Sequence, residues 1–556
     1  MKRVLLVVLA ALLFLSSCDD AGDSTSLSLS VESNMVYDTG IYDESAAEIV
    51  YYDSTNDRIL FTNGSEGSVN ILTETNGELS LESGDSLIFG DGDANSVSVY
   101  NGVAAVAVAA ADKTDDGSVY FVDVATGTSL GAVTVGALPD MVTFTPDGSY
   151  VLVANEGEPE EEYAADPEGS VSIIEVELAD TLSDSTFTLV DTVTFDSSDL
   201  EEDGDGVEVR TSEYLADWTG YPGTYSVAND IEPEYIAVDS DSLYAYVACQ
   251  ENNAIAKIYI PTGKAVTVKS LGYKDYSDGD VGVDLYNDEI ACVESRPYYG
   301  LYMPDAICTF EVGGETYIAT ANEGDDRADW EDDTDIEDHD CTKAKNLEDD
   351  FGLTLDDVFK DSTTGEILDD YSSLKVSPYD CIDSDDDGDI DILVGFGARS
   401  FSIWDEDLDL VYDSGSLFET YTVENYPDYS NCSNDNLVID DRSSKKGPEP
   451  EAITAGEVDG IPVLFVGLER FGGFFAFDVS DPEEPEMLLY HTDRNFDATI
   501  DSDLEYSSDD SLDNTGDLGP EGFCFISSDD SSDGTAKLIV GSEVSGTVRV
   551  YDVEYN

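Results

Sequence analysis

The chain has 556 residues and a formal net charge of −101 at pH 7, from 124 acidic and 23 basic residues. A surface this acidic repels nucleic acid and anionic lipid, which excludes direct binding to either. Hydrophobic residues still make up 41% of the chain, so a folded protein is expected. Two causes of the charge stay open: adaptation to high salt, and calcium binding by carboxylates that cluster in space.

The amino terminus is predicted to be an export signal. Lys2 and Arg3 precede an apolar run, and Leu15-Ser16-Ser17-Cys18 follows it. This resembles a bacterial lipobox, so residues 1–17 are interpreted as a lipoprotein signal peptide and Cys18 as the lipidated residue. Residues 18–25 would form a tether to a bacterial membrane, on its periplasmic or cell-surface side. No other apolar stretch is long enough to cross a bilayer.

The rest of the chain, 26–556, repeats a unit of three strands that is clearest over residues 138–176. Met141–Phe144 and Tyr150–Ala154 are apolar runs joined by Pro146-Asp147-Gly148, a typical turn sequence. An acidic loop follows, and Ser170–Val176 returns as the third strand. Similar units are predicted at 48–73, 96–124, 235–260, 306–325, 390–405, 452–479 and 523–553.

These units predict an all-β chain, a β-propeller of seven or eight four-stranded blades. The last unit ends after three strands, and the lone strand at 26–31 could supply its fourth and close the ring, which removes exposed strand edges. Acidic insertions are expected near 197–225, 326–379 and 413–446. A pair of β-sandwiches is the structural alternative.

Two acidic positions recur in these units. One directly follows a proline just before the first strand, at Asp140, Glu234, Asp305, Glu451 and Glu521. The other follows the second strand, at Glu66, Glu156, Glu251, Glu323, Glu469 and Glu543. Because these two loops emerge on the same face of a propeller blade, both sets are predicted to surround one mouth of the central channel.

Clustered carboxylates cannot all stay charged without cations, and oxygen-only ligands suit calcium or another divalent metal. Arg399 stands at the second position of one unit and Arg470 beside another, which favours internal ion pairs or a polar or anionic ligand such as phosphate. The alternative is that each glutamate accepts backbone hydrogen bonds from its own turn. The predicted ligand-binding residues are Glu156, Glu234, Glu251, Glu323, Arg399, Glu451, Glu469, Arg470, Glu521 and Glu543.

A separate calcium loop is predicted where acidic residues alternate around Gly388. Its ligands would be Asp383, Asp385, Asp387, Asp389 and Asp391. The twelfth position is Val394, so a complete EF-hand is not supported. A solvated acidic turn is the alternative.

Catalytic residues cannot be assigned from the sequence. The two histidines, His339 and His491, are part of no recognisable triad or zinc motif. Seven cysteines besides Cys18 are scattered without a CxxC pair, so no zinc site is indicated and disulfide pairing stays open.

The loop sequences resemble a known family. The strings LPDMVTFTPDG, LVANEGEPE, FGARSFSIWD, KGPEPEAI and VGLERFGGFFAFDV are similar to those of the choice-of-anchor I family. The resemblance implies an exported propeller held by one of several kinds of anchor, and some members are labelled alkaline-phosphatase-like. Three functions are therefore considered: a lipid-anchored propeller that binds calcium and a polar or anionic ligand, a calcium-dependent phosphoesterase, and a scaffold for protein partners.

Overall fold

The computed structural model describes residues 28–90, 92–160, 165–211, 226–277, 279, 281–327, 340–498 and 512–556. The predicted signal peptide, the tether and Cys18 lie outside the described residues, as do His339 and parts of the first two insertions. None of the helices in the described residues is long and apolar enough to span a membrane. The seven cysteines of the described ranges are all free thiols.

Six sheets of four antiparallel strands and one sheet of five strands form the body of the described structure. The first sheet contains β2 (Val50–Asp53), β3 (Arg58–Asn63), β4 (Ser68–Glu74) and β5 (Leu79–Ile88). The second contains β6 (Ala94–Tyr100), β7 (Val103–Val108), β8 (Asp116–Asp123) and β9 (Thr128–Ala137). The third contains β10 (Pro139–Phe144), β11 (Tyr150–Asn155), β12 (Ser170–Glu177) and β13 (Thr186–Val193). The fourth contains β15 (Ile236–Val238), β16 (Tyr244–Cys249), β17 (Ala254–Tyr259) and β18 (Lys264–Ser270), with β14 (Leu200–Glu201) added parallel to β18.

The remaining three sheets follow the same order from first to last strand. The fifth sheet contains β21 (Ile307–Val312), β22 (Glu315–Asn322), β26 (Ser400–Trp404) and β27 (Leu410–Asp413). The sixth contains β28 (Pro450–Val458), β29 (Ile461–Leu468), β30 (Phe474–Asp478) and β31 (Glu486–His491). The seventh contains β32 (Pro520–Ile526), β33 (Ala536–Ser542), β34 (Thr547–Tyr555) and β1 (Leu29–Asp38). The N-terminal strand β1 thus pairs with the C-terminal strand β34, as the sequence predicted.

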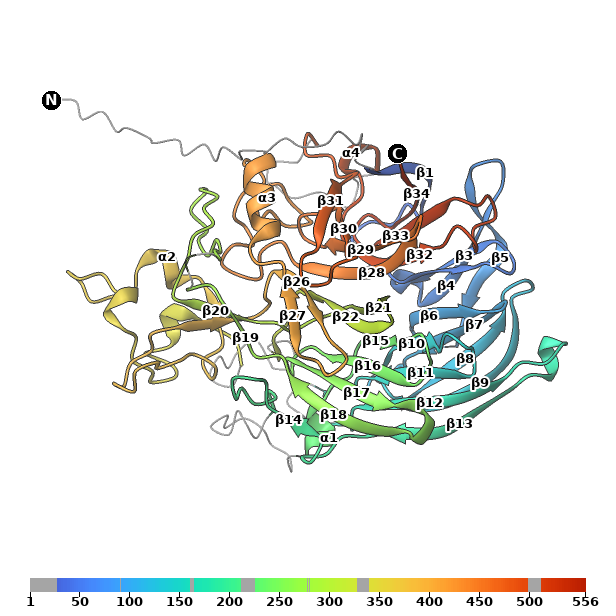
Figure 1. Ribbon diagram of the computed structural model, residues 1–556, viewed down its shortest axis with the longest axis horizontal. Coiled ribbons are helices and arrows are strands. Elements are labelled where there is room, and N and C mark those ends of the chain that lie inside the picture. Colours follow the sequence, from blue (N-terminus) through green and yellow to red (C-terminus); the bar gives the residue numbers. More distant parts are fainter. Residues whose placement is uncertain are drawn as a thin grey trace, which may run out of the picture.

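The sheets stack side by side around a centre, which is the arrangement of a β-propeller (Figure 1). Each neighbouring pair shares a cluster of buried apolar side chains, and the seventh sheet packs on the first through residues such as Ile539 and Phe61. Middle strands such as β7 are buried over their whole length, which explains their unbroken apolar sequence. The first strands of all seven sheets line a central channel of 640 Å³.

Of the sixth sequence unit, only the strand at Ser400–Trp404 joins the sheet of the fifth unit, which is why the ring has seven sheets and not eight. Strand β22 pairs with β26, with Asn322 opposite Ser400, although 77 residues separate the two strands. The intervening segment lies to one side of the ring (Figure 1). It contributes β23 (Thr342–Lys343), α2 (Asp369–Ser372), β24 (Lys375–Val376) and β25 (Leu393–Gly395), and β25 pairs with β20 (Tyr298–Leu301), which in turn pairs with β19 (Tyr273–Asp275).

This side module has its own apolar core, in which Leu355, Phe359 and Tyr371 pack with Leu285 and Tyr298. The insertion is therefore more than an acidic surface loop. The other helices are α1 (Val227–Asp230), α3 (Leu417–Asn425) within the third insertion, and α4 (Leu512–Thr515).

Candidate functional site

The acidic residues that follow proline share one local structure. In β10, β28 and β32 the pairing register shifts just after the proline, so that Asp140, Glu451 and Glu521 each lie in a β-bulge. A bulge turns a side chain away from the regular alternation of a strand. At the corresponding places before β15 and β21, the backbone N–H groups of Glu234 and Asp305 donate to Ala248 and Ala321 of the neighbouring strands.

These five carboxylates meet at one end of the central channel. They line a cavity of 320 Å³, here called the inner cavity, together with Glu48 and Glu156. Its fourteen lining residues include seven carboxyl groups and no basic side chain. The predicted first-position residues are thus brought together, and Glu48, which lacks a preceding proline, joins them from the start of the first sheet.

Three of the six second-position residues are tied by backbone hydrogen bonds to the residue just before the proline of the same unit. The N–H groups of Glu156, Glu469 and Glu543 donate to the carbonyl oxygens of Leu138, Glu449 and Gly519, the residues just before each proline, at 2.8–2.9 Å. Leu138 and Glu449 have positive φ angles of 46° and 53°, a conformation that is strained for residues other than glycine.

A second cavity of 640 Å³, the vestibule, adjoins the inner cavity. Glu323, Glu469, Glu543 and Arg470 line it, and it shares Gln250, Asp305, Glu451 and Glu521 with the inner cavity. Glu251, next to Gln250, is 6% exposed and lines neither. Apart from Arg399 and Glu251, every predicted ligand-binding residue therefore lines one of these two adjoining cavities.

Burial and mutual repulsion raise the pKa values of these carboxyl groups. Burial, followed by repulsion from Glu543, raises the pKa of Glu48 to about 7. Burial and then Glu158 raise that of Asp140 to about 6. The pKa of Glu451 is raised well above its usual value by burial and then by Glu469. Without cations, such a cluster must take up protons to stay folded.

Several carboxylate oxygens of the mouth have no hydrogen-bond partner although they are buried. These are the Oε2 atoms of Glu234, Glu251, Glu451 and Glu521. Two groups bring carboxylate oxygens within 4.8 Å of one another, namely Glu48, Glu521 and Glu543, and Asp305, Glu323 and Glu451. Unpaired buried oxygens at this spacing are suited to a hard divalent cation.

Glu449 organises the basic residues on the other side of the vestibule. This fully buried carboxylate accepts from Arg442 Nε at 2.8 Å and from Arg470 Nε at 3.0 Å, and lies 3.6 Å from Lys446 Nζ. Burial alone would raise its pKa, but Lys446, Arg442 and Arg470 lower it to about 2. Arg470 also pairs with Glu469 at 2.9 Å.

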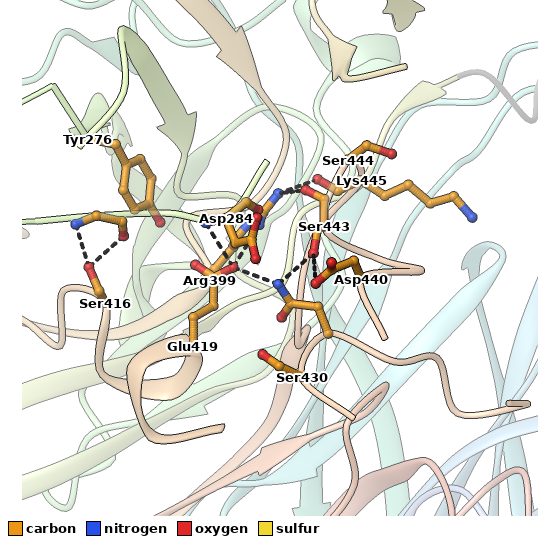
Figure 2. Close-up of polar contacts among 12 residues, drawn as sticks. Tyr276, Asp284, Arg399, Ser416, Glu419, Ser430, Asp440, Ser443, Ser444 and Lys445 are labelled. Atoms are coloured by element: carbon orange, nitrogen blue, oxygen red, sulfur yellow. Dashed lines mark hydrogen bonds and ion pairs between the residues drawn. The ribbon is translucent and has the colours of Figure 1, made fainter. Parts of the chain in front are cut away.

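Arg399 lies away from the lining of both cavities. It is 1% exposed and donates to the carbonyl oxygens of Asp284, Ser443 and Lys445, each at 2.8 Å, and to Glu419 at 3.0 Å (Figure 2). Its contacts are those of a residue that holds neighbouring loops in place. The sequence placed Arg399 among the ligand-binding residues because it cannot reveal which way the side chain points.

The predicted calcium loop lies in the side module and lines neither cavity. Carboxylate oxygens of Asp383, Asp385 and Asp391 lie within 4.8 Å of one another. A second group contains Asp356, Asp389 and Asp391. The sequence did not suggest Asp356, which the β-bridge between Leu355 and Ile390 brings close to the loop. Asp387 belongs to neither group, and its carboxylate accepts from the backbone N–H of Asp389.

One known family accounts for most of the chain. The model of the choice-of-anchor I domain matches residues 48–482. The chain belongs to the choice-of-anchor I family. The match supports a secreted or cell-surface protein, and the matched range holds most of both cavities, including the third insertion.

Curated relatives of this choice-of-anchor I protein are distant. A mesenchyme-specific cell surface glycoprotein of Strongylocentrotus purpuratus is 24% identical over 283 residues, 47% of this chain and 36% of that protein. Gigasin-3a of Magallana gigas is 33% identical over 112 residues, 19% of this chain and 39% of that protein. The chain thus spans little more than a third of the length of these relatives.

The similarity to solved structures is distant. Hydrazine synthase of Kuenenia stuttgartiensis has a TM-score of 0.42 at 12% identity, covering 92% of this chain and 96% of that one. The WD40 domain of Toxoplasma gondii coronin has a TM-score of 0.42 at 8% identity, covering 95% and 87%.

Proposed function

We propose that this extracellular propeller binds calcium at its acidic mouth, together with a polar or anionic ligand. The observation that carries the proposal is the inner cavity, where seven carboxyl groups meet without a basic residue and three of them have a buried oxygen without a hydrogen-bond partner. Since burying unpaired carboxylates is costly, a cation that bridges them would offset that cost.

Calcium fits this donor set better than softer metals do. Carboxylates and amide oxygens surround the inner cavity, and no histidine or cysteine is among its lining residues. Hard cations prefer such oxygen ligands, and calcium tolerates the variable ligand number and geometry that seven carboxylates from six sheets provide. The same oxygens also suit magnesium or manganese.

The test is a calcium titration of chelator-treated protein by isothermal calorimetry, with the double variant Glu451→Gln/Glu521→Gln beside the wild type. We expect saturable binding that the double variant weakens at least about tenfold, because two charged ligands are lost. Glu457→Gln, an exposed position on β28, is the matched control. Equal calcium binding by wild type and double variant would overturn the proposal.

The loop at 383–391 is proposed as a separate, more exposed calcium site. Asp383, Asp385 and Asp391 would be its ligands. The variant Asp385→Asn/Asp391→Asn is expected to remove one calcium from the stoichiometry and to leave the mouth intact, since this loop lies outside both cavities. An unchanged stoichiometry would identify the loop as a solvated turn.

Attachment to the membrane is proposed to occur through lipid on Cys18, which lies outside the described residues. Replacing Cys18 by alanine is expected to release the protein from the membrane fraction and to abolish incorporation of radiolabelled palmitate. Membrane attachment of the variant equal to that of the wild type would contradict lipidation at this residue.

The phosphoesterase and the scaffold lack a comparable observation in the described residues. His491 pairs with Asp493 at 3.1 Å and lines neither cavity. Arg399, considered for stabilising phosphate charge, is held by Glu419 and by backbone carbonyl groups.

A further inference from the structure

The vestibule concentrates positive charge in a chain that has very little. Five of the 23 basic residues of the protein line this one cavity, namely Lys375, Arg442, Lys445, Lys446 and Arg470. Carboxylates line the same cavity and continue into the inner cavity. A ligand in the vestibule would therefore contact cationic and anionic side chains at once.

A rigid loop presents three of these basic residues. Arg399 donates to the carbonyl oxygens of Ser443 and Lys445 (Figure 2). Arg442 binds Glu449. Gly447, with a φ of 69°, packs so closely that an added Cβ would lie 2.9 Å from Arg399 Cδ. Figure 2 shows the Lys445 side chain extending away from Arg399. The loop is thus held by its backbone. Lys446 Nζ pairs with Glu323, whereas Lys445 Nζ makes no ion pair within the described residues.

The basic residues and a bound cation would compete for the same carboxylates. Lys446 Nζ lies 2.8 Å from Glu323, and Arg470 NH1 lies 2.9 Å from Glu469. Carboxylate oxygens of Glu323, Glu449 and Glu469 lie within 4.8 Å of one another, and Glu323 also groups with Asp305 and Glu451. Eight carboxylates and five basic side chains line the vestibule, so a divalent cation bound there offsets part of the negative charge that repels an anion.

We propose that the vestibule binds a phosphate-type dianion on Lys445, Lys446 and Arg470, and that calcium at the mouth promotes this binding. The inference rests on the proposed calcium site. When calcium takes oxygens of Glu323 and Glu469, Lys446 and Arg470 keep Glu449 as a partner but lose one carboxylate each. The cavity is then less negative, and a dianion meets less repulsion there. Arginine offers a fork of donors that matches phosphate oxygens, and lysine acts as a point charge.

Linkage makes the effect reciprocal. If calcium increases the affinity for phosphate by some factor, phosphate must increase the affinity for calcium by the same factor. Couplings of this kind are typically about 5- to 150-fold. We therefore expect phosphate to bind at least about tenfold more tightly in the presence of saturating calcium.

The test is equilibrium dialysis of the full chain with radiolabelled inorganic phosphate, below the solubility limit of calcium phosphate, with calcium or with chelator at constant ionic strength. Lys445→Gln is expected to weaken phosphate binding about tenfold, the loss of one charge-assisted contact, and to leave the calcium stoichiometry unchanged. Lys343→Gln, an exposed lysine of the side module, is the matched control.

The outcomes separate the two proposals. Calcium binding that is unaffected by phosphate, or phosphate binding that is equal in wild type and Lys445→Gln, would overturn the anion site and leave the calcium site standing. No calcium binding under either condition would overturn the proposed function itself. Competition with glycerol 3-phosphate distinguishes the possible sources of the dianion. If it displaces labelled phosphate, the site also accepts phosphomonoesters. If it does not, the site is specific for the free anion.

Discussion

Replacing Glu449 by glutamine is expected to lower the free energy of unfolding by about 3–5 kcal/mol, the typical cost of removing one partner from a buried ion pair. Glu449 is fully buried, and Arg442, Arg470 and Lys446 converge on it. Glutamine has nearly the same shape as glutamate but no charge, so the three cations would lose one negatively charged partner. The effect would be measured by urea unfolding at pH 7 and fixed ionic strength.

Glu457→Gln is the control for this prediction, because Glu457 lies on the same strand, β28, and is exposed. It should change the unfolding free energy by no more than about 0.5 kcal/mol. An unfolding midpoint for Glu449→Gln equal to that of the control would mean that the basic residues are held in place without this carboxylate.

Replacing Glu48 by glutamine is expected to stabilise the calcium-free protein at neutral pH. The pKa of Glu48 is raised from 4.5 to about 7 by burial and by Glu543, so the folded protein retains a proton that the unfolded chain releases. The stability linked to this proton is complete below pH 4.5 and is lost as the pH rises through 7. Wild type should therefore lose about 2–3 kcal/mol more than Glu48→Gln between pH 5 and 8.

Thermal unfolding in chelator at a series of pH values measures this difference. Glu44→Gln, exposed and four residues away, should follow the wild type. Calcium at about one hundred times its dissociation constant should raise the free energy of unfolding of the wild type by roughly 2.7 kcal/mol. The increase should be smaller for Glu48→Gln. Parallel pH profiles for wild type and Glu48→Gln would show that the Glu48 carboxyl is not in the electrostatic environment described here.

The features that could be predicted are those that follow from a local sequence pattern repeated along the chain. Asp140 and Glu156 stand at fixed distances from a proline and a strand end, and the same spacing recurs in other units. Because propeller blades place equivalent loops at one face, repetition along the chain becomes proximity in space. The apolar strand runs likewise predict the sheets, since middle strands are buried on both faces.

Features made by contacts between distant segments could not be predicted in this way. Glu48 lacks the proline that marks its counterparts, although it precedes a first strand as they do. Three of the five basic residues of the vestibule come from the third insertion, which has no equivalent in the other units. Arg399 occupies a repeated position, but Glu419 and the loop at 443–445 turn it away from the mouth.

The most direct test of the acidic mouth is anomalous diffraction from crystals soaked with manganese, an oxygen-preferring substitute for calcium. We predict an anomalous peak in the inner cavity or at its border with the vestibule, within about 2.6 Å of carboxylate oxygens of Asp305 and Glu451 or of Glu48 and Glu521. Peaks confined to the exterior of the molecule, with none at these carboxylates, would contradict a shared cation site at the propeller mouth.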